Sequence, residues 1–320
     1  MTRWNWTWED HEAPATDAGD ALPEWISPGG GDGGRRRRAP RAAQFAAIAV
    51  VALALHLLLS DGAHHPHAAA AAAGSTARPP GAPRAPAAPS LTARENAAID
   101  AVLARMPAVV AGGPRGHEVA LTFDDGPGPY SDHLIRTLRR LHTPGTFFVI
   151  GEMERYFSSA TRAEVADGDA IGDHTQTHPD LALLSLSDQR LQLLDQAAEI
   201  GQQGAPFPRL FRPPYGDFNA TTLHLLHDLH MLMVLWSTDT SDYQLPGVRA
   251  IVHRALAGAH PGAIILLHDA GGNRVETIAA LPAIVHGLER RGLTPVTVPR
   301  LLLDDPPIKA PSLQGRIAGD

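Results

Sequence analysis

The sequence contains no cysteine among its 320 residues, so disulfides are excluded and the fold depends on its packed core. It also lacks any internal repeat of solenoid length. Beyond the N-terminal segment no basic stripe is present, and the formal net charge is −7. This charge balance argues against nucleic acid as a partner.

The N-terminal part has two features of a membrane anchor. Residues 1–41 are polar, rich in Gly, Pro and acids, and end in an arginine run, which predicts a disordered segment. Residues 42–60 contain an apolar run of about 18 residues, close to the length that crosses a bilayer. Because arginines precede this run and none directly follow it, we expect residues 1–41 in the cytoplasm and the rest outside. The sequence thus predicts a single-pass protein of the cytoplasmic membrane.

Two other interpretations of residues 42–60 are a buried core helix and a cleavable signal peptide. The small residues at 67–74 offer cleavage sites, in which case the mature protein is secreted. Residues 61–109 are rich in Ala and Pro and are typical of a tether. A catalytic domain is expected at 110–308, with a short helix at 91–105 leading into it and a tail at 309–320.

Strand-like and helical stretches alternate through the predicted domain. Apolar strand-like runs are followed directly by polar groups, as at Asp124 and Asp125 or at His268. Functional residues at the carboxyl ends of successive strands are typical of a parallel β/α barrel, so we predict an α/β fold of this kind. The expected helices are 131–141, 188–202, 221–230, 248–260 and 275–291. In the second of these, Leu191, Leu194 and Ala198 are expected to form the apolar face.

Asp124 and Asp125 end an alternating run that Gly126 and Pro127 interrupt. Neighbouring residues leave a strand in different directions, so one carboxylate can bind a cation while the other faces a water. The alternative is an ordinary turn or helix cap.

His174 and His178 are four residues apart, the spacing at which two imidazoles share one face of a helical turn. With Asp125 they would form a two-His, one-carboxylate site suited to Zn²⁺, or to Fe²⁺ in oxygenases. The motif lacks the Glu that follows the first His in zinc proteases. Among 17 histidines a chance pair is the alternative.

Arg212 begins the stretch Arg-Pro-Pro-Tyr-Gly, in which the prolines stiffen a loop. Its guanidinium either faces a buried carboxylate, keeping it ionised and oriented, or lies on the surface.

In these motifs the chain resembles the polysaccharide deacetylase family, the NodB-homology domain of carbohydrate esterase family 4. The resemblance covers roughly residues 116–304 and implies a NodB-like distorted barrel of about seven strands, here preceded by the transmembrane helix. The matching stretches, in order, are 122–126, 174–178, 212–216, 239–243 and 265–268.

The resemblance implies a role for each matching residue. Asp125, His174 and His178 would bind a divalent metal, most often Zn²⁺, with Co²⁺, Ni²⁺ or Mn²⁺ as alternatives. The remaining roles are Asp124 as general base, Arg212 orienting it, His268 as general acid, Asp242 paired with His268, the Tyr215 backbone N–H binding the oxyanion, and Leu266 with Tyr243 as walls of the acetyl pocket.

Tyr243 departs from the family pattern, which usually has Trp there. A smaller ring with a hydroxyl changes the shape of the expected pocket. The alternative is that Tyr243 only packs beside the barrel.

These features predict a metal-dependent hydrolase that removes N-acetyl groups from an extracellular amino-sugar polymer, such as peptidoglycan or a chitin-like oligosaccharide. The alternatives are an O-acetyl esterase of the same family acting on a xylan-type polymer, and a surface protein that binds glycan without catalysis. An iron oxygenase would leave Asp124, Arg212 and His268 without tasks.

Overall fold

The computed structural model describes residues 89–313 of the chain. The predicted segments 1–41 and 42–60, and most of the predicted tether, lie outside these residues. Within residues 89–313, no helix has the length and apolar character needed to span a membrane.

The described part is built on a nine-stranded sheet whose strands pair in parallel. Eight strands follow the order β1-β6-β5-β4-β3-β2-β8-β7, and β9 pairs with β2 beside them. The strands are β1 (Ala108–Val109), β2 (Glu118–Asp124), β3 (Thr146–Val149), β4 (Ala170–Asp173), β5 (Leu210–Phe211), β6 (Leu232–Val234), β7 (Thr238–Asp239), β8 (Ile264–His268) and β9 (Thr294–Val296).

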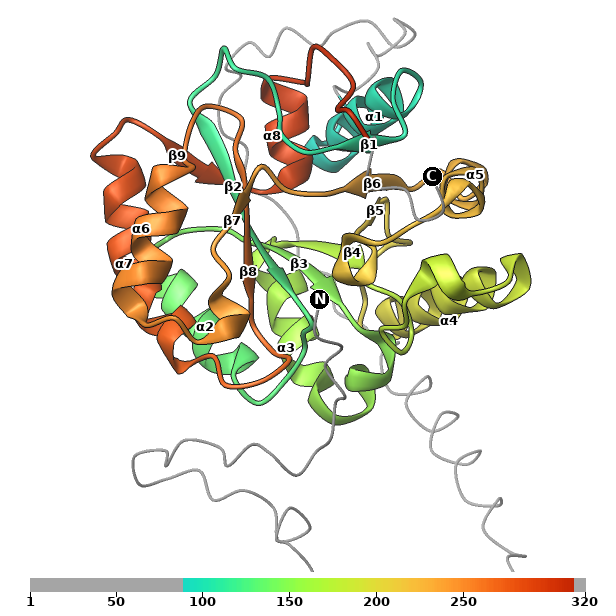
Figure 1. Cartoon of the computed structure of the whole chain (residues 1–320), viewed down its shortest axis with the longest axis horizontal. Helices are drawn as coiled ribbons and strands as arrows, with labels where there is room; N and C mark the ends of the chain where they lie inside the picture. Colours follow the sequence, from blue (N-terminus) through green and yellow to red (C-terminus); the bar gives the residue numbers. More distant parts are fainter. Residues whose placement is uncertain (1–88, 314–320) are drawn as a thin grey trace, which may run out of the picture. The chain divides into compact units, whose positions relative to one another are not determined.

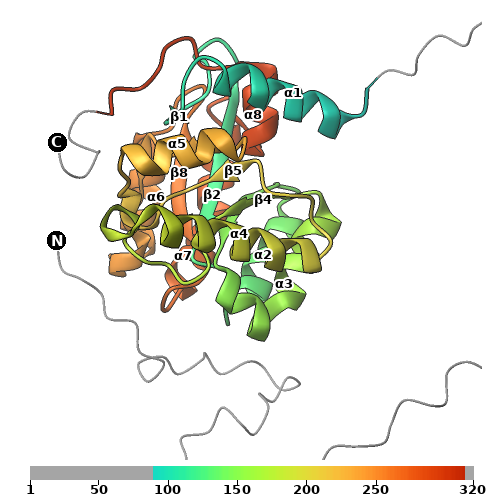
Figure 2. The ribbon, with the colours of Figure 1, turned by 90° about the vertical axis from the view of Figure 1, so that its right-hand side faces the viewer.

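Helices connect the strands and surround the sheet, as Figures 1 and 2 show. This alternation fits the parallel pairing, because a parallel pair of strands needs a crossover connection. The α-helices are α1 (Leu91–Leu103), α2 (Ser131–Arg140), α3 (Glu154–Asp167), α4 (Leu186–Gln202), α5 (Ala220–Asp228), α6 (Val248–Ala257), α7 (Val275–Glu289) and α8 (Val298–Asp304). Short 3-10 turns are η3 (Gly151–Met153), η4 (Leu181–Leu183), η5 (Pro214–Gly216) and η6 (Asp242–Gln244).

Strand β2 is buried on both faces, and its alternating side chains enter different parts of the core. Val119, Leu121 and Phe123 belong to a cluster with residues of α2 and α7. Ala120 belongs to a second cluster, which includes residues of α1 and α8. Because side chains alternate along a strand, Asp124 shares the face of Ala120. The pleat thus directs this carboxylate into the sheet's concave interior.

The predicted distorted parallel β/α barrel is confirmed as a half-barrel. The structure has eight strands along the sheet plus β9, where about seven were expected, and β1 and β7 are the ends of the pairing order. Strands β1, β5 and β7 have two residues each, too few for a hydrophobic period to reveal them.

The expected helices are present with ends shifted by a few residues, but the sequence did not predict α3 or α8. The expected apolar face of α4 is wrong. Leu191 and Ala198 are exposed, whereas Gln189 and Gln196 are fully buried on the core side with Leu193. The two glutamines are accepted in the core because their amides donate to backbone carbonyl oxygens of Leu184 and Val149.

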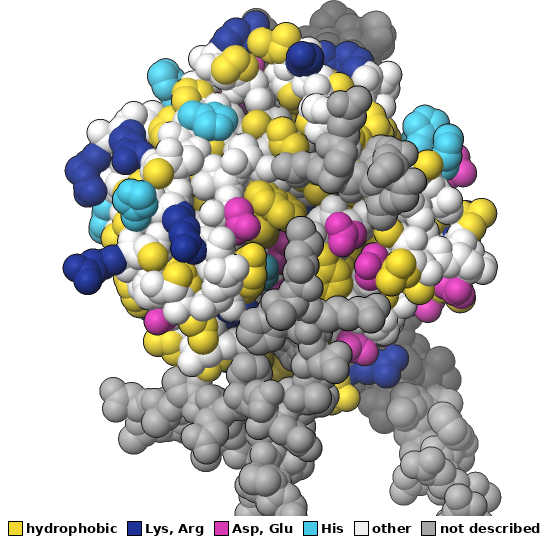
Figure 3. Space-filling view, in the orientation of Figure 1, with side chains coloured by type: hydrophobic (Ala, Val, Ile, Leu, Met, Phe, Trp, Pro, Cys, Tyr) yellow, Lys and Arg dark blue, Asp and Glu magenta, His cyan; other side chains and the backbone are white. Residues whose placement is uncertain are grey.

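On the face drawn in Figure 3, most of the visible Lys and Arg side chains lie in the upper and left parts, and several acidic side chains lie near the middle.

Candidate active site

Asp124 and Asp125 lie where β2 ends, and the backbone turns sharply between them. Asp124 is the last residue of the strand and is 4% exposed. Asp125 has a φ of 73°, in the left-handed region that residues other than glycine seldom adopt. The turn sends the two carboxylates in different directions, as expected for neighbouring residues at a strand end.

Arg212 is fully buried in the interior of the half-barrel and contacts Asp124 directly. Its Nη1 donates to Asp124 Oδ1 at 2.7 Å and to Thr122 Oγ1 at 2.9 Å. Nε and Nη2 donate to the carbonyl oxygens of Val234 and Leu235. The guanidinium also lies 4.1 Å from the centre of the Phe148 ring. These contacts fix both the position of Arg212 and the orientation of the Asp124 carboxylate.

Burial lowers the pKa of Arg212, and the neighbouring Asp124 raises it in part. A guanidinium remains charged even so, because its ordinary pKa is far above neutrality. Because Arg212 is fully buried, the structure excludes the alternative of a surface arginine.

His174 and His178 are brought together by a loop, so the expected helical turn is wrong. His174 directly follows β4, and Thr175 and His178 have φ values of 73° and 56°, which a right-handed helix does not allow. Local side chains hold the loop instead: Asp173 Oδ1 accepts from Thr175 N, and Thr175 Oγ1 accepts from His178 N. Short polar side chains of this kind compete with helical hydrogen bonds.

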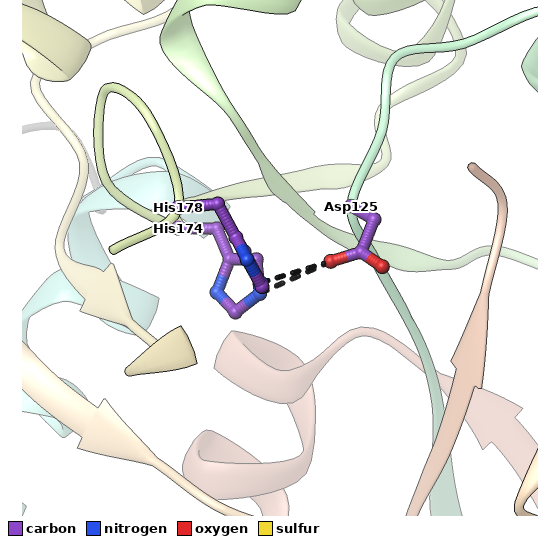
Figure 4. A group of neighbouring side chains, drawn as sticks. All are labelled: Asp125, His174 and His178. Carbon is purple, nitrogen blue, oxygen red and sulfur yellow. Dashed lines mark ion pairs between the residues drawn. The ribbon is translucent and has the colours of Figure 1, made fainter. Parts of the chain in front are cut away.

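Asp125 faces both imidazoles, as Figure 4 shows. Its Oδ1 lies 3.5 Å from His174 Nε2 and 3.2 Å from His178 Nε2. Burial alone would raise the pKa of Asp125, but His178 and His174 lower it well below its usual range. The carboxyl is thus ionised at neutral pH.

These three side chains fit a divalent metal. One ligand atom from each lies within 4.8 Å of the other two, and the set of two imidazoles and a carboxylate suits Zn²⁺. His174 Nδ1 is 2.7 Å from the carbonyl oxygen of Arg212. This bond places the ring proton on Nδ1 and leaves the lone pair of Nε2 directed at Asp125, as metal-binding histidines require.

His268 and Asp242 form a second buried pair. His268 Nδ1 lies 2.8 Å from Asp242 Oδ1, and the His268 backbone N–H donates to Asp242 Oδ2. Thr277 Oγ1 also donates to Oδ2, at 2.7 Å. Burial would lower the pKa of His268, but Asp242 raises it to about 9. The imidazole therefore carries a proton at neutral pH.

The β2–β8 register places the two buried pairs side by side. Asp124 is the residue opposite His268, and Thr122 is opposite Leu266. Because Leu266 and His268 are two residues apart in β8, they share one face of the strand. Asp124, which is bound by Arg212, and His268, which is bound by Asp242, thus lie opposite each other on adjacent strands.

Tyr215, Tyr243 and Leu266 lie around these groups. The Tyr215 ring packs edge-on against His178 with ring centres 4.8 Å apart, and 55% of the residue is exposed. The Tyr243 ring packs in the same way against His268, at 5.4 Å. Leu266 is 4% exposed. Tyr243 therefore contacts His268, and its role as a wall of the acetyl pocket stays a prediction.

Several buried polar groups near the site were not predicted from the sequence. Asp269 follows His268 and accepts a hydrogen bond from Ser131 Oγ, and burial raises its pKa to about 7. Glu154 and Glu164 lie in α3, and burial raises the pKa of both. An acidic residue in a helix usually faces solvent, so no sequence signal distinguished these two.

Comparison with known proteins agrees with this site. A family model described as polysaccharide deacetylase matches residues 111–234. A peptidoglycan-N-acetylglucosamine deacetylase of Bacillus cereus is 36% identical over 189 residues, covering 58% of this chain and 87% of that protein. A chitooligosaccharide deacetylase of Bradyrhizobium sp. is 34% identical over 197 residues, covering 57% of this chain and 90% of that protein.

The fold comparison gives the same result. The crystal structure of the Bc1960 peptidoglycan N-acetylglucosamine deacetylase matches with a TM-score of 0.60 and 29% identity, covering 62% of this chain and 94% of that chain. The chain belongs to the polysaccharide deacetylase family. The prediction of an enzyme of the polysaccharide N-deacetylase class is confirmed at this level.

Proposed function

We propose that this protein hydrolyses N-acetyl groups of an amino-sugar polymer, namely peptidoglycan or a chitin-like oligosaccharide. The observation that carries the proposal is the pairing of Asp124 with His268 across β2 and β8, each held by a partner of opposite charge. Amide hydrolysis needs a base for the attacking water and an acid for the leaving amine, and the two residues supply both.

The base in this proposal is Asp124. Its Oδ1 is bound by Arg212, and its Oδ2 lies 4.0 Å from His174 Nε2, on the side of the metal ligands. Asp125, His174 and His178 would hold the divalent metal, which supplies Lewis acidity and an acidified water when bound. Asp124 accepts the proton of the attacking water, and Arg212 keeps the carboxylate facing it.

The acid in this proposal is His268. A pKa of about 9 keeps its imidazole protonated, and the bond from Nδ1 to Asp242 directs Nε2 away from that carboxylate. Nε2 then donates its proton to the departing amine. In this proposal Leu266 and Tyr243 form the walls of the pocket that accepts the acetyl group. The backbone N–H of Tyr215 donates to the oxyanion.

Acetate release by the purified protein, loaded with defined metals, tests the proposed function. The substrates are N-acetylated peptidoglycan fragments, chitooligosaccharides and O-acetylated xylan oligosaccharides. We expect acetate from the N-acetylated glycans. Release from O-acetylated xylan alone would identify an esterase of the same family, and binding without release would identify a glycan-binding protein.

We further propose that the reaction takes place outside the cytoplasmic membrane. The support is the apolar run within residues 42–60, preceded by arginines, and the polymers named for the relatives. The metal proposed for the site is Zn²⁺, because its coordination number and geometry suit two imidazoles and a carboxylate.

A further inference from the structure

The segment after β8 lies against the loop that carries Asp125, with no room between them. A methyl group added at Gly126 would lie 2.3 Å from Asp269 Oδ2, and one at Gly128 would lie 2.5 Å from the Ala270 side chain. A methyl group at Gly271 would lie 2.1 Å from Asp125 Oδ2. Residues 269–271 thus follow the 125–128 loop closely, and glycine permits this approach on both sides.

Asp125 has an uncommon backbone conformation that neighbouring contacts can hold in place. Its φ of 73° lies in the left-handed region, which Asp adopts more readily than most residues but less readily than glycine, so contacts that hold this conformation also hold the carboxylate. On one side the carboxylate meets His174 and His178, and on the other Oδ2 meets the Gly271 backbone.

Arg274 is bonded to the backbone of the same segment. Its guanidinium donates to the carbonyl oxygens of Ala270, at 2.6 Å, and of Gly271 and Asn273. Arg274 is 2% exposed, and within residues 89–313 it forms no ion pair. The hydrogen bonds of this buried guanidinium all go to carbonyl oxygens of the segment, so they fix the shape of its backbone, and its charge also helps to lower the pKa of Asp242.

We propose that residues 269–274 act as a clamp that sets the orientation of Asp125 toward the two imidazoles, with Arg274 as its positioning residue. The inference rests on the proposed metal site but not on the choice of substrate. Arg274 holds two consecutive carbonyl groups, Gly271 takes its left-handed conformation with a φ of 72°, and its backbone then blocks Asp125 from turning away.

Gly271→Ala tests the contact, and Gly292→Ala is its matched control. Both glycines have nearly the same φ, 72° and 70°, but a methyl group at Gly292 meets no atom within 4 Å. The measurement is Co²⁺ affinity of the metal-free protein, followed by visible absorption, with the melting temperature recorded beside it. We expect Gly271→Ala to lose affinity by about 10-fold or more, the scale of lost support to a ligand, while Gly292→Ala binds as the wild type. Equal affinity in the two variants would overturn the clamp.

Arg274→Met tests the positioning residue, with Arg209→Met as control because Arg209 also donates to a carbonyl oxygen, that of His230, away from the site. We expect Arg274→Met to weaken Co²⁺ binding and Arg274→Lys to restore part of it, since an ammonium keeps the charge and some donors. Should Arg274→Met not fold, Arg274→Lys and Gly271→Ala decide the question. Wild-type affinity in a less stable Arg274 variant would make the residue merely structural.

A wild type that binds Co²⁺ but releases no acetate would contradict the proposed function and leave the clamp standing.

Discussion

At the scale of single residues, Asp124 and Asp125 show how backbone geometry separates two identical side chains. The strand pleat directs Asp124 to Arg212, and the left-handed turn directs Asp125 to the histidines. The sequence predicted two carboxylates at a strand end, but it contained no signal for the φ of Asp125. That angle depends on packing against residues more than 140 positions later in the chain.

Asp124→Asn should keep the metal and lose catalysis. The amide oxygen still accepts from Arg212 but cannot take a proton from water, so we expect a loss of about 10²-fold or more in kcat. Metal stoichiometry and acetate release, measured on the same preparation, check this. Asp125→Asn is the comparison and should lose metal. Loss of metal in Asp124→Asn would mean that the two acids have exchanged roles.

Asp242→Asn should move the basic limb of the pH profile to lower pH. His268 acts while protonated, so the rate falls as pH rises through its pKa, about 9 with Asp242 present. Without the carboxylate, burial alone lowers that pKa, and the fall should begin at lower pH. The measurement is kcat/KM against pH, with Asp228→Asn on the exposed end of α5 as control. A basic limb unchanged in Asp242→Asn would exclude His268 as the acid.

At the scale of secondary structure, α3 is one of two helices that sequence patterns did not reveal, the other being α8. Two of the buried positions of α3, Glu154 and Glu164, are acidic. Glu164 is fully buried, and within residues 89–313 neither of its carboxylate oxygens has a hydrogen-bond partner. Hydrophobic periodicity fails in such a helix because its inward face is partly polar. The same limit applies to α4, where buried glutamines replaced the apolar face that the sequence predicted.

Glu164→Gln should stabilise the protein, and more so at pH 8 than at pH 5. Burial raises the folded-state pKa of Glu164 well above 4.5, so its contribution to stability is present below pH 4.5 and is lost as pH rises toward the folded pKa. Glutamine has the same shape without that loss. The melting temperature of Glu164→Gln should exceed that of the wild type by more at pH 8 than at pH 5. The control is Glu152→Gln, at an exposed position, and its melting temperature should follow that of the wild type at both pH values. A destabilised Glu164→Gln at pH 8 would contradict this account.

At the scale of the whole molecule, the order of strands and helices was predictable from the sequence. Each parallel crossover consists of an apolar strand-like run followed by a stretch with helical period, and both are long enough to recognise. The strand count and the closeness of Asp124 to His268 were not, because register is set by packing between elements far apart in sequence. The motif at 174–178 was recognisable, yet its backbone is a loop rather than the helix that its spacing favoured.

The orientation of the whole chain is testable with fusions. If residues 42–60 span the membrane with residues 1–41 inside, a reporter active only in the cytoplasm should be inactive when attached after Asp320 and active when attached after Arg41. Protease added to intact cells should digest the catalytic domain and spare residues 1–41. An active reporter after Asp320 would exclude both the anchor and a cell-wall substrate.

Arg212 occupies the centre of the half-barrel, where a protein selected for stability alone would place a hydrocarbon side chain. Replacing a buried ion pair by apolar groups of similar size is often neutral or stabilising. Thermal selection acting on this fold without selection for activity would therefore favour apolar residues at 212 and 124 together. The same positions limit how far a heat-resistant variant can be evolved without losing its chemistry.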